Sequence, residues 1–329
     1  LRPALLWQLK GPILGTGGLQ VLLTSVALTG VGYLLGLPWQ QGLAIGLILA
    51  LSSTAIVLQS LQERKLMQSE SGRSAFAVLL FQDIAVIPIL AILPLLAIAP
   101  VASSGSSELA GWQHGLLVVA AIAGIVLGGH YLMRPVFRAI AQSHMREIFV
   151  AAALLLVIAI AVLMESVGLS PALGSFLAGV VLADSEYRHE LEADIEPFKG
   201  LLLGLFFMSV GAGIDFSLFA AHPLLIPALV IGLMVLKWLV LMGLGFVIRL
   251  SPNQRWTFAL ALAQGGEFAF VLFSFAAQNK VLPGSTISLL TLVVALSMAL
   301  TPLLLILNDR VIQPLSLIHI SEPTRRTPI

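Results

Sequence analysis

Long runs of apolar residues recur along the whole chain, and they constrain its fold more than any other feature. A helix of about 20 apolar residues crosses the roughly 30 Å hydrocarbon core of a bilayer. We predict ten such spans, at residues 17–36, 41–62, 73–98, 112–133, 147–165, 170–183, 199–217, 223–248, 255–277 and 286–307. Charged residues make up only 10% of the chain, whereas soluble domains carry about 25%. The sequence therefore predicts an all-α polytopic membrane protein of about ten transmembrane helices.

The basic residues between these spans predict the orientation of the chain. On one side fall Arg2, Lys10, Arg64, Lys65, Arg73, Arg134, Arg138, Arg146, Arg188, Lys199, Arg249, Arg255 and Arg310. The opposite loops contain only Lys280. Because Lys and Arg are enriched in cytoplasmic loops, we assign the first side to the cytoplasm. We expect a multi-pass protein of the inner (plasma) membrane, with the lipid bilayer as its surroundings and no nucleic-acid partner.

Three ionisable residues lie well inside predicted spans, namely Asp83, Lys237 and Glu267. A charge at the bilayer centre costs about 3 kcal/mol on insertion scales, so it needs a compensating partner. Asp83 lies ten residues from Arg73 and Lys237 twelve from Arg249, which puts both roughly 15–18 Å deep at about 1.5 Å per helical residue. Equal depth predicts an Asp83–Lys237 ion pair near the middle of the membrane.

Two spans carry sequences that weaken a helix. In "LSSTA" (51–55), Ser52, Ser53 and Thr54 compete for backbone hydrogen bonds, and "QGGE" (264–267) places two glycines before Glu267. Broken helices at membrane depth line cavities or pack against protein, and transporters use them to expose backbone carbonyls to cations. Because spans one to three and eight to ten each contain one break, we predict an inverted repeat. Glycines four apart predict close helix packing, at Gly32/Gly36, Gly42/Gly46, Gly124/Gly128 and Gly200/Gly204.

Structural roles for the same residues stay open at this stage. Asp83 and Lys237 could be a purely structural pair, and Gln82 could hydrogen-bond a neighbouring helix. The three hydroxyl residues could bond to their own helix, and Glu267 could be structural or gating rather than touch an ion.

Four long segments carry a family resemblance: "LALSSTAIVLQSLQERKL", "GRSAFAVLLFQDIAVIPILAILPLLA", "SEYRHELEADIEPFKGLLLGLFFMSVG" and "AQGGEFAFVLF". They resemble the membrane domain of the bacterial Kef-type, glutathione-regulated potassium efflux antiporters, in the cation:proton antiporter-2 group. The resemblance runs from about residue 2 to 310. It implies an elevator-type, inverted-repeat antiporter fold with two broken crossing helices, at 51–55 and 264–267.

The resemblance implies a function and a site. Gln82 and Asp83 match the family's ion site and Lys237 its partner lysine. We expect Asp83 to bind a proton and a potassium ion alternately, giving potassium efflux coupled to proton entry. Gln82 would supply its amide carbonyl, and Thr54 with the exposed backbone carbonyls of the break would complete an oxygen shell. The full set of candidate ion-binding and proton-coupling residues is Asp83, Gln82, Lys237, Thr54, Ser53, Ser52 and Glu267.

Other functions are weighed against this reading. A sodium:proton antiporter would use the same side chains, and a ligand-gated, channel-like potassium efflux protein would use similar polar helices with a continuous pore. We expect no enzyme, because the sequence shows no nucleophile–base pair, no metal-ligand spacing and no cysteine. We expect no cofactor in this chain, only potassium and protons as substrates.

The resemblance also implies a domain organisation. We expect residues 1–310 to form the exchanger domain with the family's N-terminal helices missing, 311–329 to be a tail, and 316–329 to be non-native. The family's cytosolic nucleotide-binding domain, which binds glutathione and a nucleotide, would be missing too. Full-length members form homodimers and can take an ancillary cytosolic regulatory subunit. The acidic loop 184–196 matches the family's regulatory loop, with Glu190, Glu192, Asp194 and Glu196 as its candidate residues.

Overall fold

The computed structural model describes residues 13–97, 146–166, 188–213 and 216–312, together with a few isolated positions between 124 and 179. Every regular element in these stretches is a helix. The chain divides into two compact units, and each is described separately. One unit contains the helices before residue 101 and after residue 213, and the other contains the helices between them.

The first unit is built from two groups of helices that follow the same order: a long helix, a helix broken in two, and a second long helix. The first group consists of η1 (Ile13–Gly17), α3 (Gly18–Leu34), α4 (Trp39–Ala50), α5 (Thr54–Glu63), α6 (Glu70–Ile92) and η2 (Leu93–Leu96). The second consists of α11 (Phe216–Ala221), α12 (Leu225–Val247), α13 (Pro252–Leu262), α14 (Phe268–Gln278), α15 (Gly284–Leu307) and η3 (Asn308–Ile312). The groups pack together through α12, which contacts α3, and through α14, which contacts α4.

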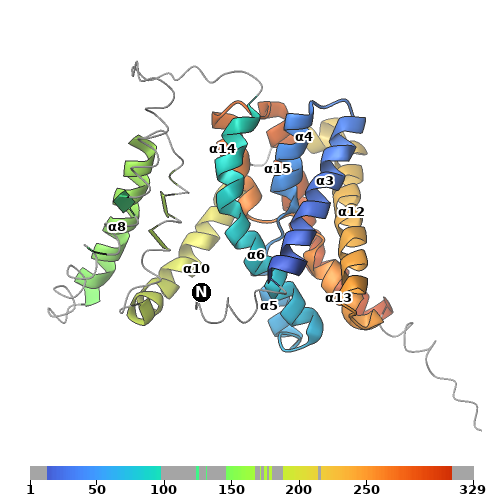
Figure 1. The fold of residues 1–329 in the computed structure, drawn as a ribbon, viewed down its shortest axis with the longest axis horizontal. Helices are drawn as coiled ribbons and strands as arrows, with labels where there is room; N and C mark the ends of the chain where they lie inside the picture. The colour runs from blue at the N-terminus through green and yellow to red at the C-terminus, as the bar shows by residue number, and fades with distance from the viewer. Residues whose placement is uncertain are drawn as a thin grey trace, which may run out of the picture. The chain divides into compact units, whose positions relative to one another are not determined.

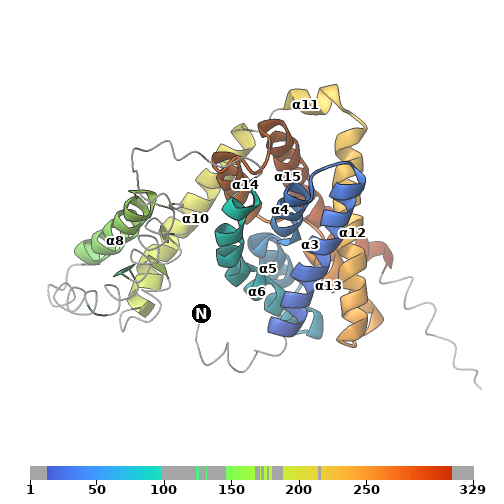
Figure 2. The ribbon, with the colours of Figure 1, turned by 45° about the horizontal axis from the view of Figure 1, so that its top comes forward.

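The two groups run in opposite directions. In Figure 1, α3 rises from the lower to the upper end of this unit, whereas α12 descends from the upper to the lower end. Figure 2 shows the short helix α11 lying across the upper end, just before α12 begins. In both broken helices, one half lies in the upper part of the unit (α4, α14) and the other in the lower part (α5, α13).

Five helices among the described residues are long and apolar enough to cross a membrane: Leu14–Leu34, Trp39–Glu63, Glu70–Leu96, Leu225–Val247 and Gly284–Arg310. They match five predicted spans to within a few residues. The predicted span 255–277 is the broken pair α13 and α14, and 147–165 is α8 (Arg146–Ser166). The predicted spans 112–133 and 170–183 lie outside the continuously described segments, so the count of ten stays a prediction.

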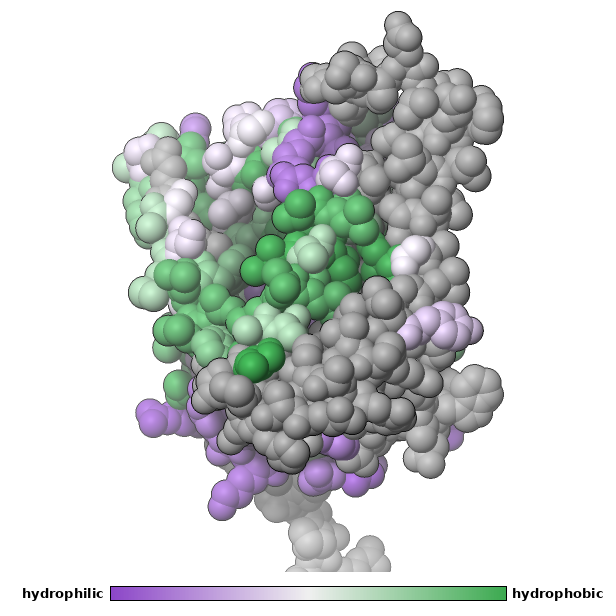
Figure 3. All heavy atoms as spheres, turned by 90° about the vertical axis from the view of Figure 1, so that its left-hand side faces the viewer, coloured by the Kyte–Doolittle hydropathy of each residue, from purple (hydrophilic) through white to green (hydrophobic). Residues whose placement is uncertain are grey.

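Side-chain polarity in the first unit follows the positive-inside prediction. The ends of α5, α12 and α15 carry Arg64, Arg249 and Arg310, and these ends lie together at the lower end in Figure 1. An ion pair of 2.8 Å between Arg64 and Asp309 joins α5 to the end of α15. Large apolar side chains such as Leu22 and Leu239 stay exposed along the helices, as lipid-facing positions require. Figure 3 shows one face of the molecule, on which hydrophobic side chains form a patch with hydrophilic side chains above and below it.

Glycines allow α3 and α4 to approach closely. A Cβ on Gly46 would lie 2.5 Å from the backbone oxygen of Ser25, and one on Gly42 would lie 3.2 Å from that of Thr29. The prediction of glycine-mediated packing is therefore confirmed for Gly42 and Gly46. It is wrong for Gly36, which has φ +83° in the turn after α3 and meets nothing within 4 Å. At Gly124, Gly200 and Gly204 a Cβ would meet no described residue within 4 Å, and Gly128 lies outside the described residues.

The apolar core of the first unit lies among α5, α6, α12, α13 and α15. Its fully or nearly fully buried members are Val57, Leu61, Ala75, Val78, Leu79, Leu241, Leu244, Leu250, Phe258, Ala259, Ala261, Leu262 and Leu305. This cluster fixes the positions of the two short half-helices whose upper ends form the breaks.

In the second unit, α8 packs against α10 (Arg188–Ala212). The segment 184–196 was predicted to be a loop, and this is wrong for residues 188–196, which form the start of α10. Acidic residues stabilise the first turns of a helix because they oppose its positive dipole end, so a solvated acidic segment need not be a loop. Glu192 and Glu196 are exposed on α10, and the Glu192 carboxylate lies 3.8 Å from Nδ1 of His189. The side chains of Glu190 and Asp194 lie outside the described part.

Candidate functional site

The first break separates α4 from α5 at Leu51, Ser52 and Ser53, which have no helical assignment. Leu51 has φ −71° and ψ 146°, and Ser53 has φ −73° and ψ 111°, so the chain is extended here. The Ser53 hydroxyl accepts from the Ile56 N–H at 3.3 Å and so caps α5. The Ser52 hydroxyl donates to the Leu262 carbonyl at 2.8 Å. The hydroxyl residues therefore both start a new helix and bind the end of α13.

The second break separates α13 from α14 at Ala263–Glu267, and it touches the first. A Cβ on Gly266 would lie 2.7 Å from the backbone oxygen of Ser52, a distance that no side chain tolerates. Only glycine allows the two interrupted backbones to meet in this way. The prediction of two broken helices, at 51–55 and 264–267, is confirmed.

The N-terminus of α5 holds two carboxylates from other helices. Asp83 Oδ1 on α6 accepts from the Thr54 hydroxyl at 3.1 Å. Glu267 Oε1 accepts from the Ala55 N–H at 3.4 Å. A helix N-terminus has unsatisfied N–H groups and a partial positive charge, both of which favour anions. Asp83 is partly exposed, so its carboxylate is accessible to an ion or a proton.

Lys237 on α12 lies at the C-terminal ends of α4 and α13, the two half-helices that precede the breaks. Its ammonium donates to the Leu51 carbonyl at 2.8 Å, to the Ser52 hydroxyl at 3.0 Å and to the Gln264 carbonyl at 2.6 Å. Lys237 is completely buried. The C-terminal carbonyls of α4 and α13 carry partial negative charge, and a cation is stabilised there.

The predicted Asp83–Lys237 ion pair is therefore wrong. Within the described part of the chain, Asp83 bonds to Thr54 and forms no ion pair with Lys237. The physical reason is that a lysine has three donors, and carbonyl and hydroxyl oxygens of the two breaks take all three. The two residues lie in the same layer, but Asp83 lies at the N-terminus of α5 and Lys237 at the C-terminal ends of α4 and α13.

Gln82, predicted to offer its amide carbonyl to the ion, uses that oxygen within the protein. Its Oε1 accepts from the Ser52 N–H at 2.8 Å. Its Nε2 donates to Gln20 Oε1 at 2.7 Å and to the Ala50 carbonyl at 3.3 Å. Gln82 is buried. The geometry thus favours the alternative in which Gln82 hydrogen-bonds neighbouring helices, and it holds the first break in its extended form.

Equivalent contacts hold the two breaks. At the first break, Gln20 on α3 donates to the Ala50 carbonyl at the end of α4, at 3.1 Å. In the other group, Lys237 on α12 donates to the Gln264 carbonyl beyond the end of α13. The third helix of each group then accepts a backbone N–H from the break, through Gln82 on α6 and, at 3.0 Å, through Ser297 on α15.

Together these contacts form a compact polar layer inside an apolar bundle. It contains two carboxylates at a helix N-terminus, a lysine at two helix C-termini, and backbone that is free of helical bonding. Such a layer can bind a monovalent cation or a proton on a carboxylate without leaving the opposing carbonyl ends uncompensated.

Comparison with known proteins decides the family. The family described as sodium/hydrogen exchanger, transmembrane, matches residues 1–306. This chain belongs to that family. It is a multi-pass membrane protein, and its relatives are transporters.

Curated relatives of this exchanger domain share about half of its residues. The glutathione-regulated potassium-efflux system protein KefC of Cronobacter sakazakii is 51% identical over 312 residues, covering 94% of this chain and 50% of that protein. The protein of the same name from Klebsiella pneumoniae is 51% identical over 311 residues, covering 94% and 49%. The one from Enterobacter is 49% identical over 315 residues, covering 95% and 50%. The exchanger domain thus spans about half the length of these relatives, and the predicted Kef-type resemblance is confirmed.

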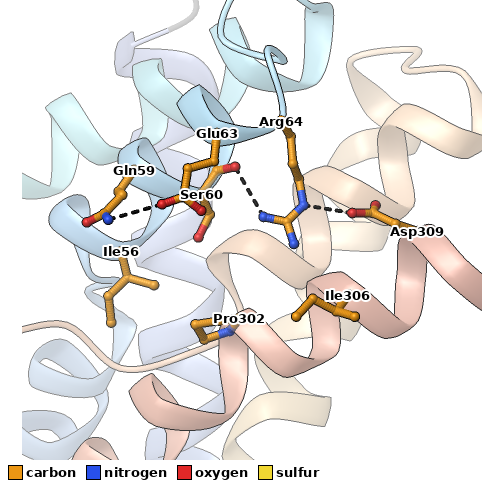
Figure 4. Close-up of a pocket in the computed structure, with 8 residues that line it drawn as sticks. All are labelled: Ile56, Gln59, Ser60, Glu63, Arg64, Pro302, Ile306 and Asp309. Atoms are coloured by element: carbon orange, nitrogen blue, oxygen red, sulfur yellow. Dashed lines mark hydrogen bonds and ion pairs between the residues drawn. The ribbon is translucent and has the colours of Figure 1, made fainter.

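A separate pocket of the exchanger domain lies between α5 and α15 at the basic end. Its volume is about 490 Å³, and it is lined by Ile56, Gln59, Ser60, Glu63, Arg64, Pro302, Ile306 and Asp309. Figure 4 shows Arg64 reaching from α5 to Asp309, with Pro302 and Ile306 on the opposite helix. Arg64 also donates to the Ser60 carbonyl at 3.2 Å. Asp83 does not line this pocket, but α5 connects the two sites.

Several residues of the polar layer were missed from the sequence. Gln20, Gln264 and Ser297 are wholly buried, yet each is a neutral polar residue among several in its span. Their location in the sequence could have identified them, because each lies in one of the six spans that form the two groups of helices. The Arg64–Asp309 pair was missed because nothing in the sequence brings residues 245 positions apart together.

Proposed function

We propose that this chain is the membrane domain of a potassium:proton antiporter in which Asp83 carries the exchanged ion or proton. The observation that supports this most is the Asp83 carboxylate at the N-terminus of α5, partly exposed and bonded only to Thr54 among the described hydrogen bonds. The curated relatives are named for potassium efflux, which favours potassium as the cation.

The arrangement of the breaks supports alternating access. Two groups of helices run in opposite directions and hold their breaks with equivalent contacts, as in transporters built from inverted repeats. We propose that the first unit moves as an elevator-type body and presents Asp83 to each side in turn. Lys237 stays bound to the carbonyl ends and stabilises the broken helices during this movement.

The roles of the remaining predicted residues follow from their contacts. Thr54 orients Asp83, Ser53 caps α5, and Ser52 and Gln82 hold the first break. The carbonyl oxygens of the break can complete an oxygen shell around a cation on Asp83.

We also propose that the acidic residues at the start of α10 have a regulatory role. Glu190, Glu192, Asp194 and Glu196 would contact a cytosolic regulatory region that corresponds to the half of the relatives outside the matched residues. Glutathione, a nucleotide, an ancillary cytosolic subunit and homodimer formation would act through that region or through the full-length protein.

The test compares Asp83→Asn with the parent in proteoliposomes containing the full-length protein, with an internal pH dye. A potassium gradient should drive proton movement in the parent and not in Asp83→Asn. Glu70→Gln is the matched control, because Glu70 is exposed at the start of the same helix α6. Undiminished potassium-driven proton movement in Asp83→Asn would refute the assignment.

The family description favours a second candidate, sodium:proton exchange. The same assay with sodium in place of potassium separates the two. A channel-like efflux protein would instead give voltage-driven potassium flux without proton movement.

A further inference from the structure

Glu267 has one carboxylate oxygen for which the described residues provide no partner. Oε1 accepts the Ala55 N–H at the rather long distance of 3.4 Å. Oε2 is buried, and no hydrogen-bond donor of the described part reaches it. A buried, unpaired carboxylate oxygen is costly, and native proteins rarely leave one unsatisfied. Oε2 therefore needs a polar group that the described residues do not provide.

Asp83 and Glu267 meet at the same helix end. Their contacts go to Thr54 and Ala55, which are consecutive residues in the first turn of α5. The two carboxylates also interact electrostatically, as like charges. The N-terminus of a helix supplies about half a positive charge, which cannot balance two carboxylates. Lys237 forms no ion pair with either carboxylate, because its three donors bind the Leu51 and Gln264 carbonyls and the Ser52 hydroxyl.

The second break contains another unsatisfied group. The side chain of Gln264 is 0% exposed, and neither its Nε2 nor its Oε1 meets a partner in the described part of the protein. Buried polar groups of this kind are commonly satisfied by ordered water. The break that ends at Glu267 thus has room for polar atoms, such as those of water or an ion, that the described residues do not supply.

We propose that Glu267 is a second carboxylate ligand of the transported cation. A monovalent alkali cation held by Asp83 is also coordinated, directly or through a water molecule, by Oε2 of Glu267. This inference rests on the proposed function, in which Asp83 carries the ion. It makes the site a pair of carboxylates, contributed by α6 and by the second broken helix, on the two sides of the α5 N-terminus.

The competing explanation is that Glu267 only caps α5. A glutamine at this position keeps the size of the side chain and a carbonyl oxygen that can accept the Ala55 N–H, but it removes the negative charge. Glu267→Gln therefore preserves the capping role and removes the proposed ligand, so the two explanations give different results.

The first measurement is potassium-driven exchange by the full-length protein in proteoliposomes, as a function of potassium concentration. We expect Glu267→Gln to raise the apparent KM for potassium about tenfold while the maximal rate stays within about twofold of that of the parent. The reason is that one of the two negative charges near the cation is lost. Glu70→Gln should leave both parameters unchanged. An unchanged KM in Glu267→Gln would overturn the proposal.

If Glu267→Gln does not transport at all, a second measurement, potassium-dependent thermal stability, tests the proposal. Potassium should raise the unfolding temperature of the purified parent, because a ligand that binds the folded state stabilises it. In Glu267→Gln, checked for helix content by circular dichroism, this potassium-dependent shift should be lost or need about tenfold more potassium. A shift equal to that of the parent contradicts the proposal. The proposed function is tested by Asp83→Asn alone. If Asp83→Asn loses exchange while Glu267→Gln keeps the KM of the parent, only the role of Glu267 is rejected.

Discussion

The Nζ atom of Lys237 lies 2.6 Å from the backbone oxygen of Gln264, the residue that follows the C-cap of α13. The same ammonium reaches the Leu51 carbonyl at the C-cap of α4. One buried cation thus stabilises the C-terminal ends of both broken helices, while Asp83 and Glu267 lie at an N-terminal end. The site has separated poles rather than a central ion pair.

Removal of the Lys237 ammonium should destabilise the fold itself. Lys237→Met keeps an apolar stem but leaves the Leu51 and Gln264 carbonyls without their donor. We expect a loss of about 3 kcal/mol in the free energy of unfolding, because buried unsatisfied groups carry their full desolvation cost. Thermal unfolding in detergent measures it. Lys280→Ala, in an exposed turn, should change stability by at most about 0.5 kcal/mol. Equal stability of Lys237→Met and parent would contradict the capping role.

A methyl group at Gly266 should separate the two breaks. Gly266→Ala would place a Cβ 2.7 Å from the Ser52 oxygen, and strain of this kind costs about 1–3 kcal/mol. Transport should fall as well, since the break positions the α5 N-terminus. Gly243→Ala is the control, because a Cβ at Gly243, within α12, meets nothing within 4 Å. Helix propensity favours alanine there by up to about 1 kcal/mol. A stable, active Gly266→Ala protein would mean that the breaks need not touch.

Gln82 and Gln20 should be energetically coupled. Each donates to the Ala50 carbonyl, and Gln82 also donates to Gln20. In a double-mutant cycle with Gln82→Met and Gln20→Met, we expect a coupling energy of about 1 kcal/mol in thermal stability, since both residues belong to one buried network. Strict additivity of the two substitutions would show that Gln82 acts independently of this network, as a side chain devoted to the ion would.

The Arg64–Asp309 pair should contribute modestly. The two side chains are 18% and 37% exposed, so solvent weakens the pair, and we expect a coupling energy of about 0.5–1 kcal/mol. A cycle with Arg64→Gln and Asp309→Asn, measured by thermal unfolding at low and high salt, tests it. The coupling should shrink at high salt. A coupling above about 3 kcal/mol would indicate that the pair is the main connection between α5 and α15.

Much of this arrangement could be predicted from residue patterns. The hydroxyl run at 52–54 and the glycines before Glu267 marked both breaks, because these residues disfavour helix wherever they occur. The acidic start of α10 was predicted as a loop because charge indicates solvent exposure but does not distinguish an exposed helix from a loop. Gln20 and Ser297 were missed because a neutral polar residue in a span gives no sign of which helix it faces.

The sequence by itself determined the five long apolar helices that the structure describes, the positions of the breaks and the depth of each charge along its helix, since these depend on apolar length and local backbone preference. Only the tertiary structure decided which groups meet at that depth. Depth is a single coordinate, whereas the partner of Lys237 depends on how each helix is rotated about its axis. Contact between the breaks at Gly266 then placed two sets of carbonyl oxygens around one ammonium.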